Sequence, residues 1–200
     1  MFGLIADRLN GLRVRYAEQH RAYHDLSHVD ALLRMLNELR PRLHDPAAVE
    51  LAIWYHDAIY DPALAGNEAR SAALLRADLA GLADPRLLAR AETLVQATAT
   101  HTLPAEADPE VTADCAAFLD MDLSILGSGE AAFWRYDAAI RREYAAVPEA
   151  AYRAGRSRVL RGLLARPRLY LTDHYRARFD APARRNLAAA LAALAADVAP

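Results

Sequence analysis

Three Asp-Pro pairs divide the chain, at Asp45-Pro46, Asp84-Pro85 and Asp108-Pro109, and a long stretch of helix-forming residues follows each of them. An aspartate carboxylate accepts hydrogen bonds from the free N–H groups at a helix start. Proline is tolerated at the first helical position, where its missing N–H has no partner to lose. Each pair therefore predicts the start of a helix.

Other boundaries follow from single residues. Asn67, before Glu68, predicts a fourth helix cap, and Gly81 and Gly127 stand where helices are expected to stop. Runs of alternating β-branched residues do not occur, and Ala, Leu, Arg and Glu dominate the segments between boundaries. We therefore predict an all-α fold, a bundle of roughly eight or nine helices. The expected ranges are 2–19, 27–40, 46–59, 67–80, 85–100, 109–122, 129–146, 149–165 and 182–198.

Length and composition narrow the class of protein. A chain of 200 residues, 54% of them hydrophobic, predicts one domain over 1–200 with a single core. The formal charge of -2 argues against an obligate nucleic-acid partner, because no overall basic field is present.

A single cysteine, Cys115, excludes an intramolecular disulfide framework and favours the cytoplasm. Charges interrupt the first apolar run, and the apolar segment 187–198 is too short to span a bilayer, so no membrane partner is expected.

Histidines gather near the N-terminus. His24 and His28 are four residues apart, a spacing that stacks side chains on one helix face, although two solvated histidines at a helix start would look the same. His56 and Asp57 form a polar pair inside Leu51–Tyr60, which is otherwise apolar all round and should be buried. A buried imidazole and carboxylate need a cation, or else an ordinary hydrogen bond or an ion pair with arginine.

A second acidic interruption occurs at Asp120 and Asp122, within Phe118–Leu126. Two carboxylates in an apolar helix end favour a bound cation. The alternative, which applies to Asp120 in particular, is that one of them caps the following turn.

The ordered residues His28, His56-Asp57 and Asp122, all expected on helices, resemble the H…HD…D pattern of the HD superfamily of metal-dependent phosphohydrolases. Further segments resemble the bacterial family of predicted HD-type phosphohydrolases of about this length, and together they cover nearly the whole chain. They are the motif at 23–28, His56-Asp-x-x-Tyr-Asp61, Asn67-Glu68, Ala97–His101, Asp120–Gly127, Ile140–Tyr144 and Gly155-Arg156. Asp25 departs from the asparagine expected in the first of these and adds an acid near the mouth of the site.

The resemblance implies an HD-type helical domain in which His28, His56, Asp57 and Asp122 hold a metal. Two imidazoles and two carboxylates suit Mn, Fe, Co, Ni or Zn and leave coordination positions open for water. Water on such an ion becomes a nucleophile near neutral pH, and the ion polarises a phosphoryl oxygen. We expect hydrolysis of a phosphoester or phosphoanhydride in a small, nucleotide-like substrate. One ion is favoured, with His101 as the candidate ligand for a second.

Other residues are assigned roles around this metal. Glu68 is the first candidate for the acid/base and Asp61 the second, the alternative for Glu68 being a carboxylate that the helix dipole favours. His24 is a candidate substrate-binding residue. For the phosphates we expect Arg141 and Arg156, with Arg142 nearby, because arginine binds phosphate through two parallel bonds; a solvated arginine face is the alternative. Tyr144 and Tyr60 are placed to contact a base or sugar, or else to pack in the core.

Two rival functions stay open. One is a two-iron oxygenase of the same fold, which would have to recruit His101 and His24 together. The other is a nucleotide-sensing binding module, which the presence of all four expected ligands disfavours. Whether the protein is a homodimer, and which substrate it takes, the sequence leaves open.

Overall fold

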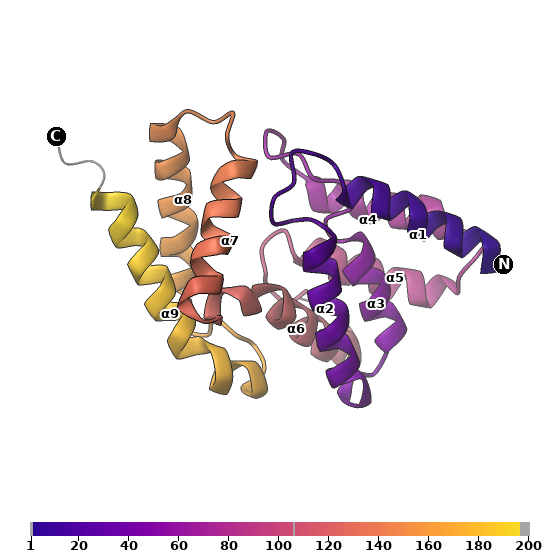
Figure 1. Ribbon diagram of the computed structural model, residues 1–200. Helices are drawn as coiled ribbons and strands as arrows, with labels where there is room; N and C mark the ends of the chain where they lie inside the picture. The colour runs from indigo at the N-terminus through magenta and orange to yellow at the C-terminus, as the bar shows by residue number, and fades with distance from the viewer. Residues whose placement is uncertain (1, 106, 197–200) are drawn as a thin grey trace. The chain divides into compact units, whose positions relative to one another are not determined.

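Helices dominate the computed structural model, which describes residues 2–105 and 107–196 (Figure 1). The α-helices over these residues are α1 (Phe2–Tyr16), α2 (Leu26–Leu39), α3 (Pro46–Tyr55), α4 (Asn67–Leu79), α5 (Pro85–Ala97), α6 (Pro109–Asp122), α7 (Glu130–Glu143), α8 (Glu149–Leu164) and α9 (Asp173–Ala196). Two short 3-10 helices, η1 (Arg40–Arg42) and η2 (Leu123–Gly127), follow α2 and α6. No strand occurs in the described residues, so the predicted all-α class is confirmed.

The predicted aspartate caps are present. Asp45 accepts a hydrogen bond from the backbone N–H of Ala48, Asp84 accepts from Arg86 and Leu87, and Asp108 accepts from Glu110. Each helix begins at the proline that follows the aspartate. The local chemistry of these pairs was therefore sufficient to place three helix starts.

One predicted cap and one predicted helix start were wrong, and the helices α1, α3, α5 and α7 end three or four residues before their predicted ends. Asn67 is the first residue of α4 and does not cap it, because its side-chain oxygen accepts from the backbone N–H of Asp61 instead; the cap position is Gly66, in the left-handed region with φ 78°. The last helix begins at Asp173, nine residues before the predicted start at Pro182, and continues through that proline. The end of the predicted range, 197–198, lies outside the described residues.

Glycine serves two different purposes at the ends of helices. Gly81 follows α4 with φ 73°, a conformation that favours glycine after a helix end. At Gly127 the requirement is space, because an added Cβ would lie 2.7 Å from both the Cβ and the carbonyl oxygen of Phe179 on α9.

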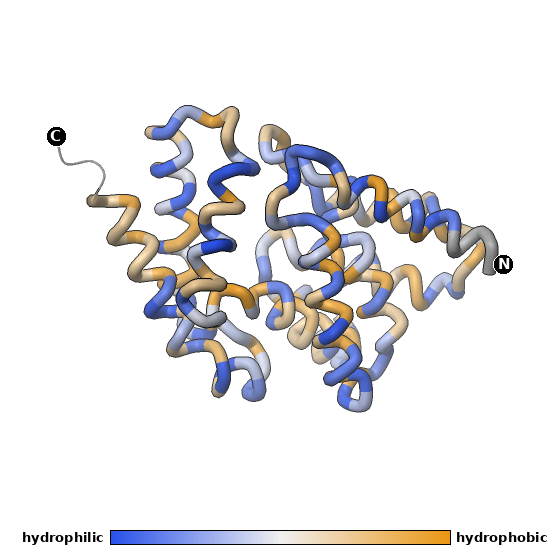
Figure 2. Tube along the Cα trace, viewed as in Figure 1, coloured by the Kyte–Doolittle hydropathy of each residue, from blue (hydrophilic) through white to orange (hydrophobic). Residues whose placement is uncertain are grey.

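The chain divides into two compact units, Met1–Leu119 and Asp120–Pro200, where the sequence predicts a single domain. The boundary falls inside α6, so no linker marks it. In the first unit α3 contacts α1, α2, α4 and α5, and in the second α9 contacts α7, α8 and η2. Most helices combine polar and apolar stretches in Figure 2, as expected for helices with one buried face.

The buried residues of the first unit centre on α3. Its residues Val49, Ala52 and Ile53 are essentially inaccessible, with Leu32 and Leu36 of α2 also buried. The apolar surroundings expected for the His56-Asp57 pair are therefore present at the end of α3. None of the described helices combines the length and the apolar character needed to cross a membrane.

Candidate metal centre

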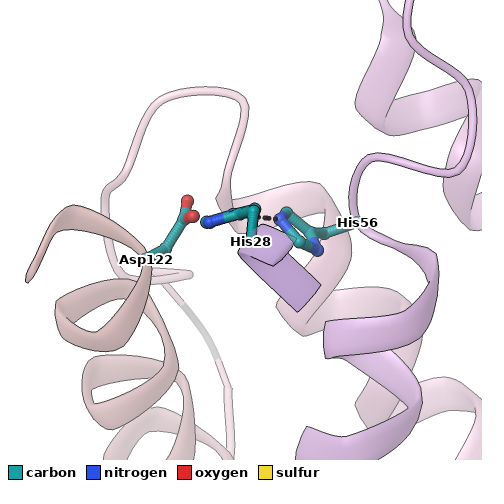
Figure 3. Close-up of side chains that lie close together, drawn as sticks. All are labelled: His28, His56 and Asp122. Atoms are coloured by element: carbon teal, nitrogen blue, oxygen red, sulfur yellow. Dashed lines mark hydrogen bonds between the residues drawn. The ribbon is translucent and has the colours of Figure 1, made fainter. Parts of the chain in front are cut away.

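Two histidines and an aspartate converge at the ends of helices (Figure 3). His28 lies in the first turn of α2, His56 directly follows the last residue of α3, and Asp122 is the last residue of α6. One ligand atom from each lies within 4.8 Å of those of the other two. Both histidines are buried, at 5% and 1% exposure, whereas Asp122 is partly exposed.

Each of these positions depends on local structure. Asp25 caps α2 by accepting hydrogen bonds from the backbone N–H and the hydroxyl of Ser27, at 2.8 and 2.6 Å, so the helix begins in time to carry His28 on its first turn. The α6 helix, started by Asp108 and Pro109, runs unbroken through the unit boundary and ends at Asp122.

Hydrogen bonding defines the protonation of the His56 ring. Its Nδ1 lies 2.9 Å from the carbonyl oxygen of Ile53, and because a carbonyl only accepts, Nδ1 carries a proton. In the neutral ring Nε2 is then a bare acceptor. This Nε2 faces Nε2 of His28 at 3.2 Å and Oδ2 of Asp57 at 3.0 Å.

A carboxylate and a bare ring nitrogen at 3.0 Å repel each other, more so in a buried site. The arrangement therefore requires a proton or a cation between them. A second proton on His56, a proton on Asp57 or a metal ion held by the same atoms would each satisfy it.

Three of the four predicted ligands belong to the converging group, and Asp57 adjoins it. Its Oδ2 contacts His56, but it is not one of the residues whose ligand atoms all lie within 4.8 Å of one another. His101, the candidate for a second ion, is not part of the group either; it follows α5 with a left-handed φ of 49°, and its backbone N–H donates to Ala97.

The second acid of the α6 end is used structurally. Asp120 is buried and accepts hydrogen bonds from the backbone N–H of Leu171 and of Thr172, both at 2.7 Å, and from the Thr172 hydroxyl at 2.6 Å. Burial raises the pKa of Asp120 above its usual value, although these bonds act to lower it. Asp120 therefore does not cap the turn that follows α6, which was the alternative predicted for it; it binds the backbone of Leu171 and Thr172, 51 and 52 residues away.

The acid/base candidates differ in how they are bound. Asp61 accepts a hydrogen bond from Ala63 N–H at 2.9 Å, and its own backbone exchanges two bonds with the Asn67 side chain, so it forms part of a closed turn. Glu68 lies in the first turn of α4, partly exposed. Because the helix dipole favours a carboxylate in the first turn, the position of Glu68 is explained equally well without a catalytic role.

Aromatic rings surround the His24 position. The rings of His24 and Tyr60 have centroids 4.4 Å apart, and His24 and His28 are 6.1 Å apart. His20 lies parallel to Tyr60 at 6.2 Å and contacts its carbonyl oxygen through Nε2 at 2.9 Å. His24 therefore lies next to the ligand candidate His28, and Tyr60 packs against His24.

The expected phosphate-binding arginines contact acids of their own unit. Arg156, 8% exposed, binds Asp137 at 2.7 Å and lies over the Tyr136 ring. Burial acts to lower the pKa of Arg156, but Tyr136 and Asp137 outweigh it and raise the pKa above its usual value.

Arg141 is held in a similar way. It binds Glu149 at 2.8 Å and lies over the Tyr152 ring. It also donates to the Tyr144 carbonyl, and the Tyr144 ring lies 6.1 Å from that of Tyr152. Arg142 is exposed at the end of α7.

One residue at the site was missed. Arg21 is buried beside the His56-Asp57 turn and bonds to the carbonyl oxygens of His24 and Asp57. Nothing in the local sequence separates this arginine from the many that are solvated, because its bond to the turn is to a backbone atom 36 residues away.

Comparison of the chain with protein-family models, with curated proteins and with solved structures found no match. The assignment of a function therefore depends on the residues described above.

Proposed function

We propose that this chain is a metal-dependent phosphohydrolase of the HD type, acting on a small, nucleotide-like phosphorylated substrate. The single observation that carries the proposal is the convergence of His28, His56 and Asp122 with ligand atoms within 4.8 Å of one another. These residues are separated widely in sequence and are three of the four that match the H…HD…D pattern. Their meeting at one point supports a shared role.

The residues present fit a divalent transition metal. Nδ1 of His56 donates to the Ile53 carbonyl and thereby directs the lone pair of Nε2 toward His28 and Asp57. A hydrogen bond from the far nitrogen is the usual support of a metal-binding histidine. His28, His56, Asp57 and Asp122 would hold the ion, and their mixed N/O donors suit Mn, Fe, Co, Ni or Zn.

When bound, such an ion polarises a phosphoryl oxygen and acidifies water. The chain itself would supply the remaining functions. Glu68 is proposed to accept and return the proton of the attacking water, with Asp61 as the second candidate. His24 would contact the substrate from beside His28, and Arg141, Tyr144 and Arg156 are proposed as further substrate-binding residues.

The competing explanation of the same geometry is a doubly protonated His56 that donates to Asp57. It predicts a site that needs no metal. The two explanations therefore differ in metal content. A two-iron oxygenase would need further nitrogen ligands, and the converging group contains only two histidines.

The test begins with metal content. We expect elemental analysis of the purified protein to find about one divalent ion per chain, as a single site of this donor set implies. Release of phosphate and pyrophosphate would then be screened over nucleoside mono-, di- and triphosphates with Mn, Fe, Co, Ni and Zn in turn. The released product identifies the bond that is broken.

His56→Ala should abolish both metal binding and phosphate release while the helical circular dichroism is kept. His44→Ala is the matched control, because His44 is about half exposed and contacts only Glu110 at 4.0 Å among the ion pairs of the described residues. A wild-type protein that binds no metal, or a His56→Ala variant that stays metallated and active, would refute the proposal.

A further inference from the structure

A buried cation lies next to the proposed metal centre. The side chain of Arg21 has no solvent exposure, although it belongs to the short connection between α1 and α2. Buried arginines of this kind need several partners, because the guanidinium carries five N–H donors and stays charged.

The partners are mostly backbone oxygens from two separate segments. Nη1 donates to the carbonyl oxygen of Asp57 at 2.7 Å and to that of His24 at 3.0 Å. Nη2 donates to the carbonyl oxygen of Ala58 at 3.3 Å. The guanidinium therefore joins the turn that contains His56-Asp57 to the loop that leads from His24 into α2.

The remaining contacts fix the orientation of the guanidinium. Nε donates to Glu18 at 3.1 Å, which offsets the positive charge. The rings of Tyr16 and Tyr60 lie 5.1 and 5.4 Å from the guanidinium carbon, within the range of cation–π contacts. A lysine could not reproduce this set, because its ammonium is a single point with no planar fork.

We propose that Arg21 is a positioning residue, which sets the conformation of the His56-Asp57 turn and its distance from the loop carrying His24. This inference builds on the proposed function, since the turn holds two of the proposed metal ligands. Arg21 itself contacts no ligand side chain among its hydrogen bonds; it acts on the His56-Asp57 turn through the backbone carbonyls of Asp57 and Ala58.

The experiment measures the turn directly, without metal. Arg21→Lys keeps the charge but loses the fork. The amide of Ala58 donates to the Tyr55 carbonyl, and that of Ile59 donates to the Ser71 hydroxyl. We expect both amides to exchange with deuterium about tenfold faster in this variant, because the turn would open locally more often. Amides in the middle of α5 should be unchanged.

Arg90→Lys is the matched control, because Arg90 lies in the same unit, is partly buried and pairs with Asp45 and Glu110. It should leave exchange at the turn unchanged. Metal affinity should fall by roughly 10- to 100-fold in Arg21→Lys, the cost of losing an outer support of a metal site, and should stay at the wild-type value in Arg90→Lys.

The intact wild-type protein offers a measurement that needs no variant. If the contacts of Arg21 hold, nitrogen NMR should find its Nε–H protected from exchange and its two NH₂ groups resolved as separate signals. Free rotation with rapid exchange would contradict the proposal even if Arg21→Lys failed to fold.

The outcomes separate this inference from the proposed function. A wild-type protein without metal would refute the function, and the exchange rates would still decide whether Arg21 holds the turn. Unchanged exchange at Ala58 and Ile59, faster exchange throughout the unit, or faster exchange with unchanged metal affinity would each overturn the positioning role.

Discussion

Oδ2 of Asp57 lies 3.0 Å from Nε2 of His56, although the two residues are adjacent in sequence and the other ring nitrogen, Nδ1, already donates to the Ile53 carbonyl. The contact brings a carboxylate against a nitrogen that has no proton in the neutral ring. A proton or a metal ion is needed there, and which of the two is present governs the first prediction.

Asp57→Asn should lower metal affinity more than tenfold, since loss even of an outer support costs 10- to 100-fold. The amide is neutral and of the same shape, so the helical circular dichroism should be unchanged. Calorimetric titration with Mn or Zn measures the effect. Equal affinity in both proteins would mean that Asp57 does not hold the metal.

Glu68→Gln should keep the metal yet slow turnover by roughly 10² to 10⁴, the range for losing a general acid or base. Steady-state kinetics beside elemental analysis separates the two quantities. Asp61→Asn is the companion variant, because the asparagine oxygen can still accept from Ala63 N–H and preserve the turn. If Glu68→Gln is fully active and Asp61→Asn is slow, their proposed roles are exchanged.

Arg156→Ala should destabilise the protein by about 3–5 kcal/mol, because it leaves the Asp137 carboxylate without its buried partner. Chemical denaturation measures this change. The proposed phosphate-binding role adds a second expectation: KM should rise strongly for a triphosphate and less for a monophosphate. Destabilisation with unchanged KM would leave Arg156 a purely structural ion-pair residue.

Gly127→Ala should destabilise the protein by about 1–3 kcal/mol, the usual range for overpacking. The new Cβ would meet backbone atoms of Phe179 at 2.7 and 3.0 Å, and a backbone cannot swing aside as a flexible side chain can. Gly155→Ala in α8 is the control: its added Cβ meets nothing within 4 Å, so the variant should be more stable by about 0.5–1 kcal/mol. Thermal or urea unfolding of both variants compares them, and equal stabilities would contradict the close approach.

Burial raises the pKa of Cys115 to about 12, from an ordinary value of 9.0. The native thiol should therefore stay protonated and unreactive at pH 8, and a thiol reagent should label it only as the protein unfolds. Because the unfolded chain ionises first, this residue's contribution to stability is complete below pH 9 and is lost as the pH rises toward 12. Cys115→Ala should show a weaker alkaline loss; rapid labelling of the native protein would refute the prediction.

Local chemistry alone determined much of this protein. The Asp-Pro pairs placed the starts of α3, α5 and α6, because a cap and its proline act within one turn and need no distant partner. The bounds of α6 were predicted in full. Leu51–Tyr60 was expected to be buried because it is apolar on every face, and most of α3 is buried.

The tertiary structure decided what depends on distant contacts. Pro182 predicted a helix start, yet α9 begins at Asp173 because Thr172 accepts from Tyr175 N–H while binding Asp120, and Phe179 packs against Gly127. The same contacts separated Asp120, which binds its own chain, from Asp122, which turns toward the histidines.

Arg21 depends on distant contacts in the same way. Its contacts with the His56-Asp57 turn are to backbone carbonyls 36 and 37 residues away, and backbone atoms leave no trace in side-chain identity. The sequence pattern thus predicted which residues are candidates for the site. Which of these acids and arginines bind the protein's own groups followed only from the folded chain.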